Sequence, residues 1–166
     1  MRRILAIIIA MCMLGMPLAN AQPKNTIIVI NHSKYISNID YKVLYDYLDL
    51  IASYWSIYHG KYYIYLSDYL PDSISFPPGS LGGHIKGVKA YVNIKDIYYA
   101  HMDPYLIITH ELAEMAVNPN LRHYDRNGNL LEICDGIYSY IYFYGNGPKR
   151  QVSLFRMPSD YAVKIA

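Results

Sequence analysis

Three ionisable side chains, His110, Glu111 and Glu114, lie within an otherwise apolar stretch of the chain. His110 and Glu114 are four residues apart, so a helix would present both side chains on one face, within reach of a single bound ion. Glu111 would point away at an angle from which it could contact a water molecule on that ion. Zinc accepts both an imidazole and a carboxylate as ligands. The pattern therefore predicts a metal-binding helix with Glu111 as general base.

The distribution of glutamate supports this interpretation. The chain has only three glutamates, Glu111, Glu114 and Glu132, whereas ten aspartates are spread along it. All three glutamates lie in or after the predicted helix, where a longer carboxylate would be needed to reach an ion. The alternative is a helix with a simply solvated polar face, but its apolar flanks would make an unpaired carboxylate costly.

A catalytic zinc needs a third protein ligand and an open position for water. Glu132, Asp135 and His123 could each supply that ligand. Glu132 and Asp135 are three residues apart in apolar surroundings, so spacing does not separate them, while His123 lies in a polar, turn-rich segment. A developing oxyanion would also need a donor, for which Tyr138, Tyr140 and His123 are candidates.

The stretch from His110 to Glu114 resembles the H-E-x-x-H helix of the zincin-like metallopeptidases, with glutamate replacing the second histidine. Glu132 is similar in position to the third ligand of the gluzincins. The resemblance implies a divalent ion, first of all zinc, held by His110, Glu114 and Glu132, with Asp135 as the other candidate, and hydrolysis of peptide bonds. Because two carboxylate ligands leave a divalent ion formally neutral, a harder ion such as Mn²⁺ is the alternative.

The chain is also similar to small uncharacterised phage and bacterial proteins that carry H-E-x-x-E-M-x-x-N/D-P followed by E-I/V-C-D. The matching segments run from His110 to Pro119 and from Glu132 to Asp135. This likeness implies a shared site and no established reaction.

The helix that carries the motif has recognisable ends. Asp103 and Pro104 are typical of an N-cap followed by proline at the first helical position. Asn118 and Pro119 are typical of a stop. The sequence therefore predicts a helix at 104–117.

Further elements are predicted on both sides of this helix. Upstream they are a buried strand at 26–31, an amphipathic helix at 40–59 ended by Gly60, a strand at 62–66, a loop at 68–83 and a strand at 87–95; downstream they are a tight turn at 125–129 and strands at 137–144 and 151–155. This order predicts an α+β fold with a mixed sheet whose edge strand precedes the metal-binding helix, and the resemblance implies that the fold is zincin-like.

The strand before the helix has the features of a sheet edge. Apolar and polar residues partly alternate along 87–95, and both of its ends are charged. A peptide substrate could pair with this edge as an added strand, which makes Ala90 and Asn93 the candidate substrate contacts; an edge without a ligand is the alternative. His84, in the preceding loop, could reach into the same cleft or lie on the surface.

The N-terminus has the pattern of a secretory signal peptide. Two arginines, an apolar run over residues 4–18 and the sequence Ala-Asn-Ala at 19–21 match its three regions. The apolar run is shorter than a spanning helix needs, so we expect no stable membrane span after cleavage. The remaining residues 22–166 are predicted to form a single domain that is secreted or periplasmic.

Charge and cysteine content limit the classes of binding partner and of covalent cross-link that the chain can have. The formal charge is +2 and falls to zero without the two N-terminal arginines, which gives no electrostatic case for nucleic acid. Cys134 would be the only cysteine left, so no internal disulfide is expected. The first hypothesis is therefore an exported metal-dependent peptidase with a peptide or protein substrate. The alternative is an inactive metal-binding or protein-interaction module on the same scaffold, whose twenty tyrosines supply a binding surface.

Overall fold

A computed structural model describes residues 25–125, 127–137, 139–158 and 164–165. The signal peptide predicted at 1–21 lies outside these described residues. The helices are α2 (Tyr41–Ala52), α3 (Ile94–Tyr99) and α4 (Pro104–Val117), and the strands are β1 (Thr26–Asn31), β2 (Lys61–Ser67), β3 (Gly82–Ile85), β4 (Lys89–Asn93), β5 (His123–Tyr124), β6 (Tyr140–Phe143), β7 (Arg150–Ser153) and β8 (Lys164–Ile165).

Four strands form a mixed sheet in the order β1-β2-β4-β3. Strands β1, β2 and β4 are parallel, and β3 pairs with β4 in the antiparallel direction. The chain passes from β1 to β2 through α2, which is the kind of crossover that parallel neighbours require. The predictions of an α+β fold and of a mixed sheet are therefore confirmed.

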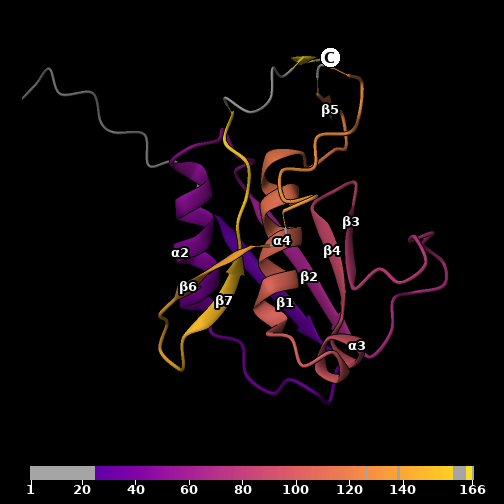
Figure 1. Cartoon of the computed structure of the whole chain (residues 1–166), viewed down its shortest axis with the longest axis vertical. Helices are drawn as coiled ribbons and strands as arrows, with labels where there is room; N and C mark the ends of the chain where they lie inside the picture. The colour runs from indigo at the N-terminus through magenta and orange to yellow at the C-terminus, as the bar shows by residue number, and fades with distance from the viewer. Residues whose placement is uncertain (1–24, 126, 138, 159–163, 166) are drawn as a thin grey trace, which may run out of the picture.

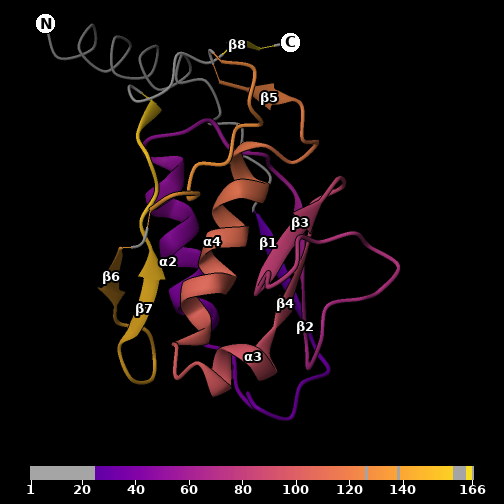
Figure 2. The same ribbon diagram turned by 45° about the vertical axis from the view of Figure 1, so that its right-hand side comes forward.

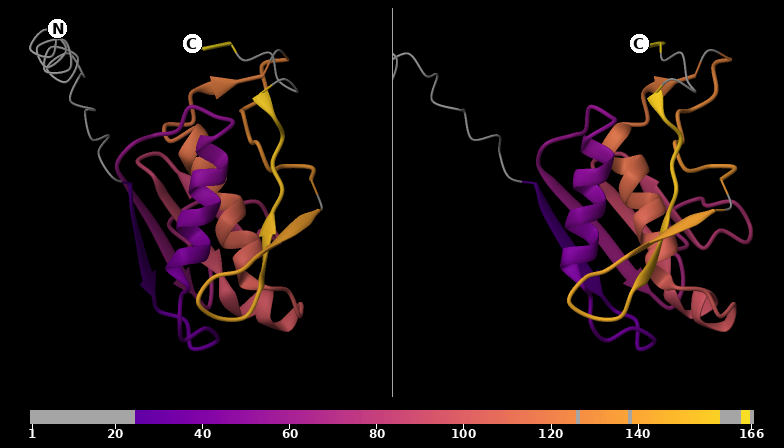
Figure 3. Two further views of the ribbon diagram at one scale, coloured as in Figure 1. Left: turned by 90° about the vertical axis from the view of Figure 1, so that its left-hand side faces the viewer. Right: turned by 60° about the vertical axis from the view of Figure 1, so that its left-hand side comes forward.

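Helix α4 lies at the centre of the molecule. Helices α2 and α4 lie side by side on one face of the sheet, and the β6–β7 hairpin lies along α4 (Figures 1 and 3). The backbone N–H of Ser153 in β7 donates to the hydroxyl of Thr109 over 3.0 Å, which ties the hairpin to the helix. Because α4 is covered on both sides, most of its residues are buried, which explains why its sequence is apolar nearly all round.

The ends of α4 are those predicted from the sequence. The Asp103 side chain accepts a hydrogen bond from the backbone N–H of Tyr105, and Pro104 occupies the first turn. Asn118 follows the last helical residue, and its N–H donates to the carbonyl of Glu114. These local capping signals place the whole H-E-x-x-E motif within one regular helix.

Helix α2 is shorter than the predicted 40–59. It ends at Ala52, where the N–H of Ser53 binds the carbonyl of Asp49. Trp55, which extended the helical pattern, is buried from an irregular segment instead, and its indole N–H donates to the carbonyl of Arg156. Tyr58, the other residue of that extension, is 40% exposed. An apolar side chain beyond Ala52 can therefore be buried in the core without continuing the helix. Gly60 precedes β2 and does not cap α2.

The predicted edge strand is in the wrong place. Strand β4 lies inside the sheet, hydrogen-bonded to β2 on one side and to β3 on the other. The edge on this side of the sheet is β3, whose first two residues the sequence assigned to the loop at 68–83. Figure 2 shows β3 beside β4, close to α4. A four-residue strand that begins with two glycines has a loop-like composition, so only the pairing with β4 reveals it.

The C-terminal part of the chain contains the predicted strands and turn. The predicted strands at 137–144 and 151–155 are present as β6 and β7, an antiparallel hairpin. Gly128, in the predicted turn, has φ 82°, and the Asp125 carboxylate accepts from the N–H groups of Asn127 and Asn129.

Within the described part of the chain, every helix is too short or too polar to cross a lipid bilayer.

Candidate metal centre

The predicted metal-binding and catalytic residues line one cleft. A cavity of about 590 Å³ lies between α4, β3 and the loop at 74–81. Its lining contains His110, Glu111, Glu114, Glu132 and Asp135. Residues from two separate segments, α4 and the stretch with Glu132 and Asp135, therefore meet where the sequence predicted a single site.

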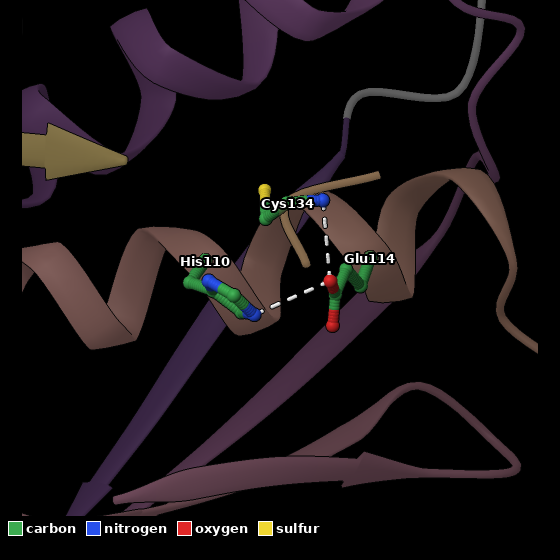
Figure 4. Close-up of side chains that lie close together, drawn as sticks. All are labelled: His110, Glu114 and Cys134. Carbon is green, nitrogen blue, oxygen red and sulfur yellow. Dashed lines mark hydrogen bonds and ion pairs between the residues drawn. The ribbon is translucent and has the colours of Figure 1, made fainter. Parts of the chain in front are cut away.

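The two motif residues on α4 have the relative position that a shared ion needs. The Nε2 atom of His110 lies 3.2 Å from Oε1 of Glu114, one helical turn away (Figure 4). Two atoms bound to one zinc ion at 2.1 Å are about 3.4 Å apart at the tetrahedral angle. Glu114 is 4% exposed and Glu111 5% exposed, so both carboxylates are held away from bulk water.

Of the candidates for the third ligand, two reach the site. The Oδ1 atom of Asp135 lies 3.4 Å from Nε2 of His110, and Glu132 lines the same cavity. His123 is absent from the lining, and its Nδ1 lies 3.1 Å from the carbonyl of Val117. Glu132 and Asp135 therefore remain as candidates in the cleft, whereas His123 lies outside its lining.

The candidates for oxyanion donor are not gathered in this cavity. Tyr140 lies in a neighbouring cavity of about 520 Å³ that also touches His110 and Asp135. Tyr138 lies outside the described residues. The structure therefore offers no tyrosine among the described residues that line the main cleft.

Asn118 holds the downstream acidic segment against the helix. Its side-chain oxygen accepts from the N–H groups of Arg122 and His123 at 2.9 and 3.0 Å. Its amide donates to the carbonyls of His123 and Leu131 at 3.2 and 3.3 Å. The next residue after Leu131 is Glu132, so this buried side chain fixes the return of the chain to the site.

Burial and charge determine the protonation of the groups. Burial raises the pKa of Glu132 to about 9, with the charge of Glu114 adding to the effect. Burial also raises the pKa of Glu111. Burial lowers the pKa of His110, but the carboxylates of Asp135 and Glu114 outweigh it and raise this pKa to about 11. In return, hydrogen bonding to His110 lowers the pKa of Asp135. The metal-free site therefore binds protons that a cation would displace.

His84 belongs to the site, although the sequence left open whether it lies on the surface. Its side chain is 3% exposed on β3, and its Nδ1 lies 3.7 Å from Oε2 of Glu111 and 3.7 Å from Oε2 of Glu114. Because β3 was expected as a loop, no pattern fixed the direction of this side chain. The cluster of His84, Glu111 and Glu114 is one of two groups in the described residues that could hold a metal ion.

Cys134 was missed as a potential ligand. With His110 and Glu114 it forms the second such group, whose ligand atoms all lie within 4.8 Å of one another. Figure 4 shows its backbone nitrogen facing the Glu114 carboxylate, a 3.2 Å hydrogen bond, while its sulfur points away. Burial raises the pKa of the thiol well above its usual range, which disfavours the thiolate that binds metals. Its position between two candidate ligands was the only signal in the sequence.

The predicted substrate contacts, Ala90 and Asn93, do not lie in the cleft. Ala90 is fully buried, and its backbone lies between Ile64 of β2 and His84 of β3. Asn93 is 7% exposed, and its side chain accepts from the N–H of Asp96 as the N-cap of α3. Neither residue lines the cleft, because β4 is not the edge of the sheet.

Comparisons with models of protein families, with curated proteins and with solved structures found no match to this chain. The site unites imidazole, carboxylate and thiol groups that could hold a metal ion, beside a carboxylate with a raised pKa.

Proposed function

We propose that this chain is an exported, metal-dependent hydrolase of zincin-like architecture that cleaves peptide bonds. The main support is the convergence of His110, Glu114, Glu132 and Asp135 in one cleft that also contains Glu111. In this proposal His110 and Glu114 hold a divalent ion, zinc first, and Asp135 or Glu132 completes the set. The 3.4 Å contact with His110 favours Asp135 as the third ligand.

The order of the elements supports the architecture. The motif helix α4 follows a mixed sheet, and the antiparallel edge strand β3 lines the same cleft as the motif. In this proposal β3, at 82–85, takes the part of the edge strand that the sequence assigned to 87–95. The signal-peptide pattern at 1–21 is the support for export.

The residues have distinct chemical tasks. A bound divalent ion would polarise the scissile carbonyl and acidify water. Glu111 would take the proton from the attacking water and pass it to the leaving amine. Its buried position suits this task, because burial raises the pKa of the carboxyl and makes its carboxylate a stronger base than one in water. Two carboxylate ligands would reduce the acidifying power of the ion, which favours a slow hydrolase.

The substrate would bind along β3. Strand β3 pairs with β4 on one side only, and all four of its residues line the cleft. An extended peptide could hydrogen-bond to the other side of β3 and so place a scissile bond over the motif helix. The loop at 74–81 forms the facing wall of the same cleft.

A second candidate function is a non-catalytic binding module on the same scaffold. The observation in its favour is an exposed aromatic cluster, in which the ring of Tyr35 contacts those of Tyr98 and Tyr99. Tyr98 and Tyr99 are more than half exposed. Tyrosine rings of this kind are common at protein interfaces.

Metal analysis, combined with the Glu111→Gln variant, distinguishes the hydrolase from the non-catalytic binding module. The hydrolase predicts about one metal ion per purified chain, loss of peptide hydrolysis in Glu111→Gln and no loss of metal. His110→Ala should lose both the metal and the hydrolysis, while His59→Ala, which changes an exposed histidine, should lose neither. Hydrolysis that survives Glu111→Gln, or metal content that survives His110→Ala, would overturn the proposal.

A further inference from the structure

We propose that His84, Glu111 and Glu114 form a second cation-binding position beside the first, and that its occupation inhibits the enzyme by removing Glu111 from proton transfer. The inference depends on the proposed function for the first ion. It adds a regulatory site whose histidine comes from β3 and lies outside the H-E-x-x-E motif.

The two oxygens of Glu114 face different partners. Oε1 lies 3.2 Å from Nε2 of His110 and accepts the backbone N–H of Cys134. Oε2 lies 3.7 Å from Nδ1 of His84. A carboxylate with this orientation can bridge two cations, one on each oxygen, as carboxylates do in two-metal sites.

The distances around His84 suit a shared ion better than hydrogen bonds. Both carboxylate oxygens that Nδ1 faces are 3.7 Å away, which is too long for a hydrogen bond. Two ligand atoms bound to one ion at 2.1–2.2 Å are about 3.7 Å apart when the angle at the ion is trigonal. The three ligand atoms therefore surround a position at which a zinc or manganese ion could bind.

The burial of His84 is an independent observation. Its side chain is 3% exposed, and Nε2 has no hydrogen-bond partner among the described residues. A buried imidazole without hydrogen bonds is costly. A cation bound to Nδ1 would give this buried ring a strong interaction at the nitrogen that faces the two carboxylates.

The charge of the cleft also accommodates a second ion. Four carboxylates, those of Glu111, Glu114, Glu132 and Asp135, share the cavity with the imidazoles of His84 and His110. When the carboxylates are ionised and the imidazoles neutral, one divalent ion balances only half of the negative charge. A second divalent ion balances the rest.

The functional consequence follows from the shared residues. Glu111 cannot accept a proton from water while it coordinates a cation. Hydrolysis should therefore rise with the first equivalent of zinc and fall, by at least roughly tenfold, as the second position fills.

The test is metal stoichiometry on the full chain, after metal removal, by equilibrium dialysis against increasing free Zn²⁺. We expect one ion per chain at low zinc and two at high zinc. His84→Ala and the larger His84→Gln should each keep the first ion and lose the second, while His59→Ala, at an exposed histidine, should bind two. In Mn²⁺-loaded protein, the paramagnetic resonance spectrum should broaden at the second equivalent, because the two ions share one carboxylate.

The outcomes separate the two proposals. A wild-type chain that never binds more than one ion overturns the second position and leaves the proposed function intact, whatever the His84 variants do. Two ions bound to folded His84→Ala, or two unbroadened manganese ions, also overturn it. A chain that binds no ion at all overturns the proposed function first.

Discussion

The Nε2 atom of His110 lies 3.4 Å from Oδ1 of Asp135, although Asp135 stands in a segment without regular secondary structure. The same nitrogen faces Glu114 at 3.2 Å. One imidazole therefore connects the helical part of the site with the part that returns from the loop, and this contact leads to the first prediction.

Asp135→Asn should weaken zinc binding more than Glu132→Gln does. Asparagine keeps the shape of the side chain but removes the charge that contacts His110, so we expect at least a tenfold loss of affinity. Titration calorimetry of the metal-free protein measures the effect. Asp49→Asn, at an exposed aspartate on α2, is the matched control and should change nothing. A larger loss in Glu132→Gln would assign the third ligand to Glu132 instead.

Metal binding should release protons. At pH 7 His110, with a pKa of about 11, holds a proton that must leave before a cation can bind. Glu132, with a pKa of about 9, holds a second proton, which must leave as well when Glu132 is a ligand. Affinity should therefore increase with pH between 6 and 9, by roughly tenfold per pH unit for each proton released. Calorimetry in two buffers of different ionisation enthalpy counts these protons. An affinity independent of pH in this range would contradict the protonation described above.

Asn118→Ala should destabilise the fold and the site together. The substitution removes one side chain that bonds to Arg122, His123 and Leu131 and leaves buried backbone groups without partners. We expect a loss of about 2–4 kcal/mol in the free energy of unfolding, measured with urea, and weaker metal binding because Glu132 and Asp135 lose their anchor. Asn146→Ala, at an exposed asparagine, should leave both quantities unchanged. Unaltered metal affinity in a destabilised Asn118→Ala would show that the acidic segment is held by other contacts.

Gly82→Ala should disturb Glu111. A Cβ atom at Gly82 would lie 2.8 Å from Cγ2 of Ile107 and 3.0 Å from Oε1 of Glu111, so β3 and α4 would have to separate. We expect a loss of about 1–3 kcal/mol in the free energy of unfolding and a lower rate of hydrolysis with metal retained. Gly147→Ala places its Cβ at an ordinary 3.8 Å from Asp40 and is the control. Equal stability of the two variants would mean that β3 has room to move.

The sequence by itself determined the motif helix and the identity of most residues in the site. The Asp103-Pro104 start and the Asn118-Pro119 stop are local signals, because capping depends on the residues beside the helix end. Spacing within one helix is equally local, so the pairing of His110 with Glu114 could be predicted. The buried strand at 26–31 followed from its β-branched run for the same reason.

Only the tertiary structure decided which strand forms the edge and which side chains join the motif. Strand order depends on contacts between distant segments. No local sequence pattern could therefore show that β3 pairs with β4 and brings His84 close to Glu111. Whether His123, Glu132 or Asp135 reaches the cleft likewise depended on the hydrogen bonds of Asn118, which turn the chain after the helix. Local propensities fix helix ends over a few residues, whereas a site built from three segments forms only when the core packs them together.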